Sequence, residues 1–533
     1  MYVSTHKKKV KDKLYISYSL RTSFRDAKGR VQHKHIANLP KCTDDEINAL
    51  KLALSFKNKL EELGSLEDVS ITNEASFGGS YVLHQIAKKL GIDKVLGNNK
   101  MGKLALWQVI ARILGRGSRL SAKRMMSKYS AEHILNLEEV DKNVMYKNLD
   151  WLHENQEKIE LELWQLRGGK KIDLYLYDVT SSYIEGNYNE LAAYGYNRDK
   201  KSGKEQIVVG LLTDDEGFPV ATRVFEGNTA DNKTVQEQIE ILRNKFNCKN
   251  VTLVGDRGML KTPQIDFLPE GFSYITGIGK ATIKKLVKEG VFQYELFDKE
   301  VQEVSHNNIR YILRKNPMIA EESKQWRDDR IAFVENYIKE KNKYLEQKKK
   351  ASEDTALRAA KKLLEKYKLT KIVTISSQDR VMVVTIDKDA LQEIAKYDGC
   401  YCLKTDVPNE IASKERVHER YKQLIQVEAA FREMKGDILN IRPLYLRKAE
   451  RTKGHVMVVM LGYMILHKLK ELWSSIEGTI EEALDSFNNV CILNVEHNKN
   501  SFLKLSNPNI ECTNLLNLAK IKWPKFIAKG IIV

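Results

Sequence analysis

Between residues 171 and 280 the chain carries four short apolar runs separated by Gly, Asp and Asn. They read IDLYLYDVT, EQIVVGLLTD, FPVATRVFEG and VTLVGDRGM, and all are rich in Val, Leu, Ile and Tyr. Such runs predict strands of one buried sheet. A helical pattern over 233–246 separates the third run from the fourth, and a further strand is expected at 272–278. The order predicts an α/β fold whose mixed sheet begins with a meander.

A chain of 533 residues is too long for one compact core, so several domains are expected. The segments outside 171–280 have different residue patterns. A β-hairpin is expected over 14–39, turning at Asp26 to Gly29, with a helix over 52–63. Helical periods dominate from 81 to 165, where 85–96 fits either a helix-turn-helix or a plain helical hairpin. The expected domains are a hairpin module with a helix at 1–70, a helical DNA-binding domain at 71–168, a core at 169–280 and 406–475, an insertion domain at 281–405, and a C-terminal helical region for dimerisation at 476–533.

The expected insertion begins where the sheet pattern pauses, after Lys280, for about 120 residues. A charged helical hairpin is predicted over 326–367, with Ile331, Val334 and Ile338 on one stripe. Strand-like segments follow at 380–386 and 399–405. A helix is then expected over 411–435, ended by Gly436.

Charge favours a polyanionic partner. Lys plus Arg total 88 against 71 Asp plus Glu, a net charge of +17 with a pI near 9.2. Such an excess favours nucleic acid over an acidic small molecule, although a basic protein without a particular partner stays open. The six cysteines form no C-x-x-C pair, which indicates neither a zinc site nor a disulfide framework and fits a reducing cytoplasm. The longest apolar run, 456–466, is shorter than the ~18 residues of a membrane span, so no membrane association is expected.

Three carboxylates are the candidate catalytic residues. Asp178 and Asp256 close apolar runs, and Gly255 and Gly258 allow a tight turn around the second. Glu428 lies in the late helix. Hard oxygen ligands of this kind suit a pair of divalent cations, which commonly act on phosphodiesters. An aspartate at a strand end is also a common helix cap or turn former, and that interpretation stays open here.

The late helix places Glu428 on a mixed polar face. Tyr421, Leu424, Glu428, Arg432 and Lys435 have offsets of 0, 3, 7, 11 and 14, which fall within roughly 80° at 100° per residue. The same stripe also fits a solvated face with an i, i+4 pair between Glu428 and Arg432. Spacing alone does not decide between them.

Several of these segments together resemble the DDE transposases of bacterial insertion sequences. The similarity lies in YDVTSSY around Asp178, GNTADNKT at 227–234, VGDRGM around Asp256, and the Y-x6-E-x6-K spacing of Tyr421, Glu428 and Lys435. It is closest to the branch with a Tyr-x2-Arg-x3-Glu-x6-Lys signature, and NIRPLYLRKAERTKGH at 440–455 is similar to the continuation of that signature. The similarity covers roughly 171–470, and the N-terminal hairpin resembles the opening module of larger members. Leu424 stands where the signature has arginine.

The resemblance implies an RNase H-like core interrupted by an insertion domain, with Asp178, Asp256 and Glu428 as ligands of two Mg²⁺ ions, for which Mn²⁺ substitutes. It implies that Tyr421 and Lys435 contact DNA phosphates, and it makes Arg432 and Lys422 candidates for the contact that Leu424 lacks. The implied enzyme is a homodimer in the cytoplasm, associated with the nucleoid. It binds the inverted repeats that end its insertion sequence, cleaves there and joins the 3′ ends to target DNA.

Two related functions stay open at this point. One is a metal-dependent DNA nuclease that cuts without joining, and the other is a noncatalytic DNA-binding protein derived from a transposase. An aspartyl-phosphate phosphatase is disfavoured because Thr180 stands where a second acid is needed. The sequence has neither a Gly-x4-Gly-Lys-Ser/Thr loop nor a dinucleotide fingerprint, which argues against nucleotide-driven motors and dehydrogenases.

Overall fold

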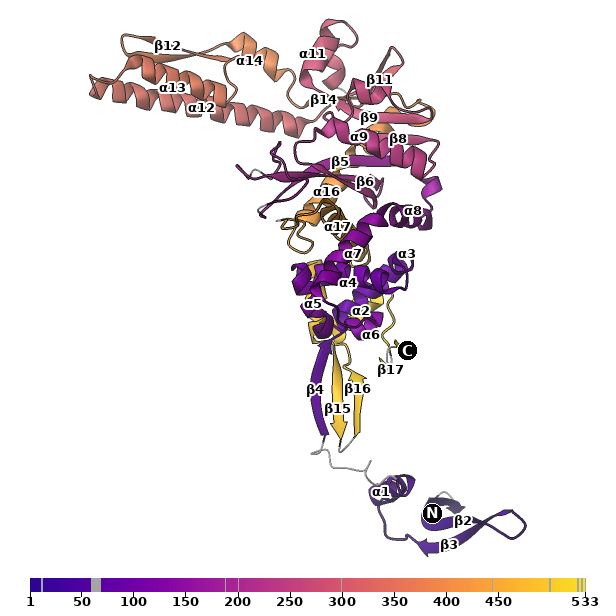
Figure 1. The fold of residues 1–533 in the computed structure, drawn as a ribbon. Coiled ribbons are helices and arrows are strands. Elements are labelled where there is room, and N and C mark those ends of the chain that lie inside the picture. The colour runs from indigo at the N-terminus through magenta and orange to yellow at the C-terminus, as the bar shows by residue number, and fades with distance from the viewer. Residues whose placement is uncertain are drawn as a thin grey trace. The chain divides into compact units, whose positions relative to one another are not determined.

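The computed structural model describes residues 1–10, 13–58, 69–186, 188–199, 201–298, 300–442, 444–497, 500–524, 527–528 and 531–532. Their contacts divide the chain into two compact units (Figure 1). The first unit comprises Met1–His84, Arg124–Glu139 and Ser475–Val533, and the second comprises Gln85–Lys123 and Val140–Ser474. Each unit is therefore assembled from segments that are distant in sequence.

The first unit opens with an antiparallel sheet of β1 (Tyr2–Val10), β2 (Lys13–Arg25) and β3 (Val31–Asn38). The predicted hairpin is confirmed: Asp26 Oδ1 accepts bonds from the Lys28 and Arg30 amides at 2.9 Å, and Gly29 has a φ of 74°. Helix α1 (Asp44–Ser55) begins earlier than predicted because Thr43 and Glu46 form a capping box. The expected end of that helix, from residue 59 on, lies outside the described residues.

The same unit contains a second antiparallel sheet in the order β16-β15-β4. It joins β4 (Val69–Ser76) to β15 (Cys491–His497) and β16 (Asn500–Leu505), strands from opposite ends of the sequence. The C-terminal region predicted to be helical, 476–533, contains α18 (Ile480–Ser486) and α19 (Ile510–Leu518) and, in addition, strands β15 and β16. Strands β17 (Ile527–Ala528) and β18 (Ile531–Ile532) pair near the C-terminus. A strand whose partner lies some 400 residues away leaves little local pattern to detect.

Helices form one part of the second unit. Helix α17 (Ala449–Leu472) packs against α4 (Lys100–Gly115) and α7 (Lys142–Glu154), and its apolar run over 456–466 is buried. Helix α2 (Gly78–Lys89), whose residues up to His84 belong to the first unit, is joined to α3 (Ile92–Leu96) at Gly91, where a φ of 74° is accessible to glycine. Helix α8 (Gln156–Leu166) belongs to the second unit, as does α5 (Arg119–Lys128) up to Lys123, whereas the rest of α5 and all of α6 (Ala131–Leu135) belong to the first. Among the described helices, none combines the length and apolar character of a membrane span.

The large sheet of the second unit has eight strands in the order β10-β11-β14-β9-β8-β5-β6-β7. Strands β5 (Leu174–Tyr183), β6 (Gln206–Asp214) and β7 (Pro219–Glu226) form the predicted antiparallel meander. After α9 (Asp231–Glu240) and the π-helix η4 (Ile241–Lys245), β8 (Val251–Gly255) pairs in parallel with β5, and β9 (Phe272–Ile278) pairs in parallel with β8. This confirms the predicted order and the α/β class.

The prediction that the strands of this sheet stop for about 120 residues after Lys280 was wrong. Antiparallel β14 (Cys400–Thr405), β11 (Ile309–Lys315) and β10 (Gln302–His306) extend it beyond β9. The basic residues of β11 obscure its pattern in the sequence. Arg310 is buried there because its guanidinium pairs with Glu303 at 2.7 Å and donates to the Val407 carbonyl at 2.6 Å. Strands at both ends of the expected insertion thus belong to the core sheet.

Between β11 and β14 the chain forms the predicted helical hairpin. Helices α12 (Pro317–Gln347) and α13 (Glu353–Lys366) share a separate core with β12 (Val373–Gln378) and β13 (Val381–Ile386). Ile331, Val334 and Ile338 are all buried in that core, which confirms the predicted stripe. Helices α11 (Lys280–Lys288) and α14 (Lys388–Ala395) flank this region in sequence.

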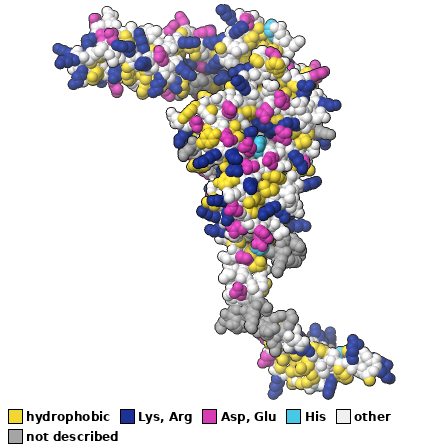
Figure 2. Space-filling view, in the orientation of Figure 1, with side chains coloured by type: hydrophobic (Ala, Val, Ile, Leu, Met, Phe, Trp, Pro, Cys, Tyr) yellow, Lys and Arg dark blue, Asp and Glu magenta, His cyan; other side chains and the backbone are white. Residues whose placement is uncertain are grey.

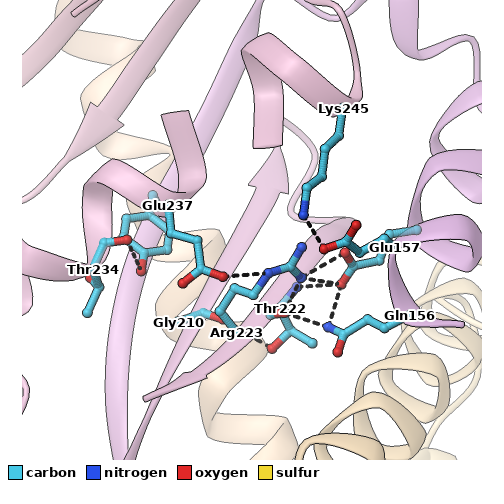
Figure 3. Close-up of polar contacts among 10 residues, drawn as sticks. Gln156, Glu157, Gly210, Thr222, Arg223, Thr234, Glu237 and Lys245 are labelled. Carbon is cyan, nitrogen blue, oxygen red and sulfur yellow. Dashed lines mark hydrogen bonds and ion pairs between the residues drawn. The ribbon is translucent and has the colours of Figure 1, made fainter. Parts of the chain in front are cut away.

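A buried ion pair fastens α8 to the edge of the sheet (Figure 3). Arg223 on β7 pairs with Glu160 at 2.8 Å and with Glu237 of α9 at 3.0 Å. Gln156 donates to Glu160 at 2.9 Å and to the Thr222 carbonyl at 2.7 Å. The Glu160 side chain is 1% exposed, so its charge depends on these partners. The network thus connects α8, the edge strand β7 and α9.

Candidate active site

Asp178 and Asp256 each follow a member of one residue pair on adjacent parallel strands. The register pairs Tyr177 of β5 with Gly255, the last residue of β8, and each aspartate comes directly after its member of this pair. Adjacent strands lie ~4.8 Å apart. The charge of Asp256 acts on Asp178 and raises its pKa, so the two carboxylates lie near each other.

Asp178 lies within β5 rather than at its end, which corrects the sequence prediction. The strand continues to Tyr183, and Asp178 pairs with Leu211 of β6 on one side. On the other side β8 stops at Gly255, so the partner strand is missing from this point on. The carboxylate thus lies where the sheet opens between β5 and β8.

Asp256 forms a tight turn after β8. Its Oδ1 accepts hydrogen bonds from the amides of Gly258 at 2.8 Å and Met259 at 2.9 Å, while Thr276 of β9 donates its hydroxyl to the Asp256 carbonyl at 3.0 Å. The turn-former interpretation is thus correct for one oxygen. Asp256 remains exposed, and in the described part of the chain Oδ2 accepts no hydrogen bond.

Glu428 reaches the same region from a helix that packs on β5. The predicted helix over 411–435 is in fact two, α15 (Lys414–Lys422) and α16 (Leu424–Lys435), with a break at Gln423. Buried Val427 and Phe431 of α16 leave Glu428 exposed. Glu428 and Asp256 line one cavity of about 540 Å³.

The three carboxylates act on one another electrostatically. Burial, together with the charges of Asp256 and Glu428, raises the pKa of Asp178 to about 7, whereas the charge of Arg198 opposes this rise. Within the described ranges, no group of three or more His, Cys, Asp or Glu side chains is placed to hold a metal ion. The carboxylates thus form a repelling cluster around Asp178 rather than a closed three-ligand cage.

Tyr421 lies beside this cluster, on the last turn of α15. Gly277 of β9 makes room for it, because a Cβ there would stand 2.9 Å from the tyrosine hydroxyl. Burial raises the pKa of Tyr421 to about 12, and the charges of Asp256 and Glu428 act in the same direction. The hydroxyl therefore stays protonated and available as a donor in the cavity.

Lys435 belongs to a different set of contacts. Its ammonium pairs with Asp199 at 2.7 Å, and Arg442 contacts the same oxygen. Asp199 is 3% exposed, and burial lowers the pKa of Lys435 although Asp199 raises it. Sequence reasoning missed Asp199 because the polar segment around it has no periodic pattern that indicates burial.

The remaining predicted residues separate into two groups. Lys422 and Leu424 line the cavity with Tyr421 and Glu428, whereas Arg432 is exposed on α16 and is not among the lining residues. His418 also lines the cavity. Burial and nearby Arg314 lower its pKa to about 4, so it is neutral and packs against Tyr401.

The arrangement is that of an α/β enzyme with a carboxylate cluster at the opening of its sheet. Residues 169–465 match the transposase DDE domain, and residues 3–68 match the N-terminal domain of the IS1634 family transposases. The first match spans more than half of the chain, so the protein belongs to the DDE transposases of bacterial insertion sequences. It is therefore a DNA transposase, an enzyme of DNA cleavage and strand transfer whose family uses divalent metal ions.

Comparison with solved structures finds a cryo-EM structure of the piggyBac transposase synaptic complex with hairpin DNA. The two chains are 9% identical, the match covers 78% of this chain and 69% of that one, and the TM-score is 0.31. No curated protein matches the chain.

Proposed function

We propose that Asp178, Asp256 and Glu428 are the catalytic carboxylates and that they hold two Mg²⁺ ions, for which Mn²⁺ substitutes. The observation that carries the proposal is the convergence on Asp178. The strand register pairs the residues that precede Asp178 and Asp256, and the charges of both Asp256 and Glu428 act on Asp178. A cation between these oxygens removes a repulsion that the protein otherwise bears.

The donor set fits Mg²⁺. This ion is commonly held by one or two carboxylates, with substrate phosphate oxygens and water completing its shell. Within the described ranges no three such side chains are placed to hold one ion, so each ion is proposed to use two of the three carboxylates. When bound, a pair of such ions activates the attacking oxygen and stabilises the leaving oxygen of an in-line phosphoryl displacement.

The chain's own residues orient the DNA. The Tyr421 hydroxyl donates to a phosphate oxygen, and Lys422 supplies a positive charge at the same cavity, where Leu424 replaces the signature arginine. Lys435 acts through Asp199 rather than as a free cation, so its role is to position that buried carboxylate and Arg442. Arg432, exposed outside the cavity, contributes to DNA contacts farther along the helix.

The core is proposed to be RNase H-like and to comprise 169–280 and 406–475, together with strands β10, β11 and β14. The antiparallel meander β5-β6-β7, followed by parallel β8 and β9, supports this assignment. We retain 1–70 as the N-terminal module, 71–168 as a DNA-binding domain and 476–533 as a dimerisation region. The proposed insertion narrows from 281–405 to the chain between β11 and β14, because β10, β11 and β14 belong to the core sheet. The proposed enzyme acts as a homodimer on double-stranded DNA, cleaving the inverted repeats and joining their 3′ ends to a target.

A cleavage and joining assay tests the proposal. Asp178→Ala and Glu428→Gln are expected to bind a labelled terminal repeat but not to cleave it, whereas the matched control Glu419→Gln, an exposed acid on α15, cleaves normally. Full cleavage by either site variant refutes the assignment. Cleavage by the wild type without joining to a second duplex indicates a nuclease, and tight binding without Mg²⁺-dependent cleavage indicates a noncatalytic protein.

A further inference from the structure

A second cavity in the same unit is lined by basic residues. It measures about 400 Å³ and lies among the end of α4, the start of α5, α7, residues 440–448 and the first turns of α17. Its cationic lining includes Arg112, Arg119, Arg442, Arg447, Lys448 and Arg451. None of the described residues that line it is Asp or Glu. Figure 2 shows basic side chains interspersed with acidic ones over the visible face, so an acid-free cluster differs from the general surface.

Two of these arginines are buried, and neither has a carboxylate partner among the residues that the structure describes. Arg112 is 8% exposed and Arg119 is 5% exposed. Arg112 donates to the backbone carbonyls of Gly117, Leu439 and Asn440. Neutral acceptors satisfy guanidinium hydrogen bonds but leave the positive charge uncompensated, which is costly in a low-dielectric interior.

Arg119 has the same kind of surroundings. It donates to the Gln108 side chain at 2.7 Å and to His455 Nδ1 at 3.3 Å. Burial lowers the pKa of Arg119 to about 9, and the charge of Arg112 acts in the same direction. Burial and both arginines lower the pKa of His455 well below its usual value, so the imidazole is neutral and accepts the bond. Arg112 and Arg119, which form the floor of the cavity, thus carry two positive charges that no described carboxylate neutralises.

The rim adds exposed cations. Arg447 and Lys448 are exposed, and within the described ranges neither forms an ion pair. Arg442 and Arg451 do have acidic partners, Asp199 and Asp150, but neither acid lines the cavity. Free donors at the rim and uncompensated charges at the floor are the features of a site that takes an anion.

We propose that this cavity binds phosphate groups and that its ligand is the DNA backbone, away from the carboxylate cluster. The inference that these phosphate groups belong to DNA rests on the proposed function, whereas the inference of an anion site rests on the arginines alone. Arg442 lines the cavity and contacts the same Asp199 oxygen as Lys435, so one buried carboxylate connects this site to the signature lysine. Backbone phosphates held here fix the register of the duplex without reading its sequence.

The test measures DNA affinity as a function of salt. Arg447→Gln/Lys448→Gln is compared with Lys158→Gln/Lys249→Gln, which removes the same charge from exposed positions outside the cavity. Binding of a duplex of arbitrary sequence is measured over a range of salt concentrations with no divalent metal. In Arg447→Gln/Lys448→Gln the slope of log K against log salt is expected to be shallower than in the wild type by about 1 to 2, because each phosphate contact contributes about 0.9. The control is expected to keep the wild-type slope.

A second measurement reports on the buried arginines and on free phosphate. Melting temperature is recorded in inorganic phosphate and in chloride at equal ionic strength. The proteins are the wild type, Arg447→Gln/Lys448→Gln (the rim variant) and Arg119→Met. A reduced salt slope in the rim variant supports the DNA proposal, with or without a phosphate-induced rise in the wild-type melting temperature. DNA is overturned as the ligand if phosphate raises the melting temperature of the wild type but not of the variants, while the slope of log K against log salt is the same in the wild type and in Arg447→Gln/Lys448→Gln.

If neither quantity depends on these residues, the anion site itself is refuted. None of these readouts requires cleavage. An inactive but DNA-binding wild type would therefore overturn the proposed catalytic function while leaving this inference testable.

Discussion

Replacing Asp178 by Asn is expected to stabilise the metal-free protein. Burial and two neighbouring carboxylates raise the pKa of Asp178 from 3.8 to about 7. A tenfold change in an acid dissociation constant corresponds to about 1.4 kcal/mol, so the penalty for ionising this group in the folded state reaches about 4 kcal/mol. An asparagine at the same position keeps the shape and removes the charge.

The sign of the pH dependence follows from linkage. Because the folded pKa is raised, the protonated group favours folding most below pH 3.8, and this contribution is lost as the pH rises through about 7. The wild type should therefore be less stable than Asp178→Asn by up to about 4 kcal/mol at pH 8, and the two should converge near pH 4.

Urea unfolding of the metal-free proteins at pH 4, 6 and 8 measures this difference, with Asp437→Asn as the exposed control. Mg²⁺ is then expected to stabilise the wild type but not Asp178→Asn. A variant that is no more stable than the wild type at pH 8, or that gains as much from Mg²⁺, would refute the reasoning.

Three further outcomes follow from the packing and the cavity. Arg223→Met should cost about 3–5 kcal/mol in urea unfolding because Glu160 is left buried and unpaired, and a Glu160→Leu/Arg223→Leu double variant should recover part of that loss; equal losses would contradict the buried-pair account. Leu424→Arg should restore the signature cation and steepen the salt slope of DNA binding by about 0.9, whereas Ile411→Arg, 61% exposed and not among the residues that line the cavity, adds the same charge elsewhere and should leave the slope unchanged. Gly277→Ala should displace the tyrosine hydroxyl and slow single-turnover cleavage with little change in melting temperature; an unchanged rate would argue against that donor.

Local pattern was sufficient for the first half of the core sheet. The runs that became β5, β6, β7 and β8 are apolar and bounded by turn residues, so their existence and order were predicted from the sequence. Strand β11 was missed because Arg310 and Arg314 interrupt its apolar character, and only Glu303 and nearby carbonyls explain how Arg310 is buried.

The sequence identified the acidic residues as candidates, but the contacts around them depend on tertiary structure. The sequence placed Tyr421 and Glu428 on one continuous helix, whereas the break at Gln423 divides them between α15 and α16. Asp199 and the pairing of Lys435 with it come from a loop more than 200 residues upstream. The basic cavity likewise joins Arg119 to His455, which no spacing rule relates.

The most direct test of the central claim is anomalous diffraction from crystals of the protein bound to a terminal repeat in Mn²⁺. Two strong peaks are predicted at the opening between β5 and β8, within ligand distance of carboxylate oxygens of Asp178, Asp256 and Glu428. Peaks at other side chains, or a DNA complex in which Glu428 remains out of reach of the ion beside Asp178, would contradict the assignment.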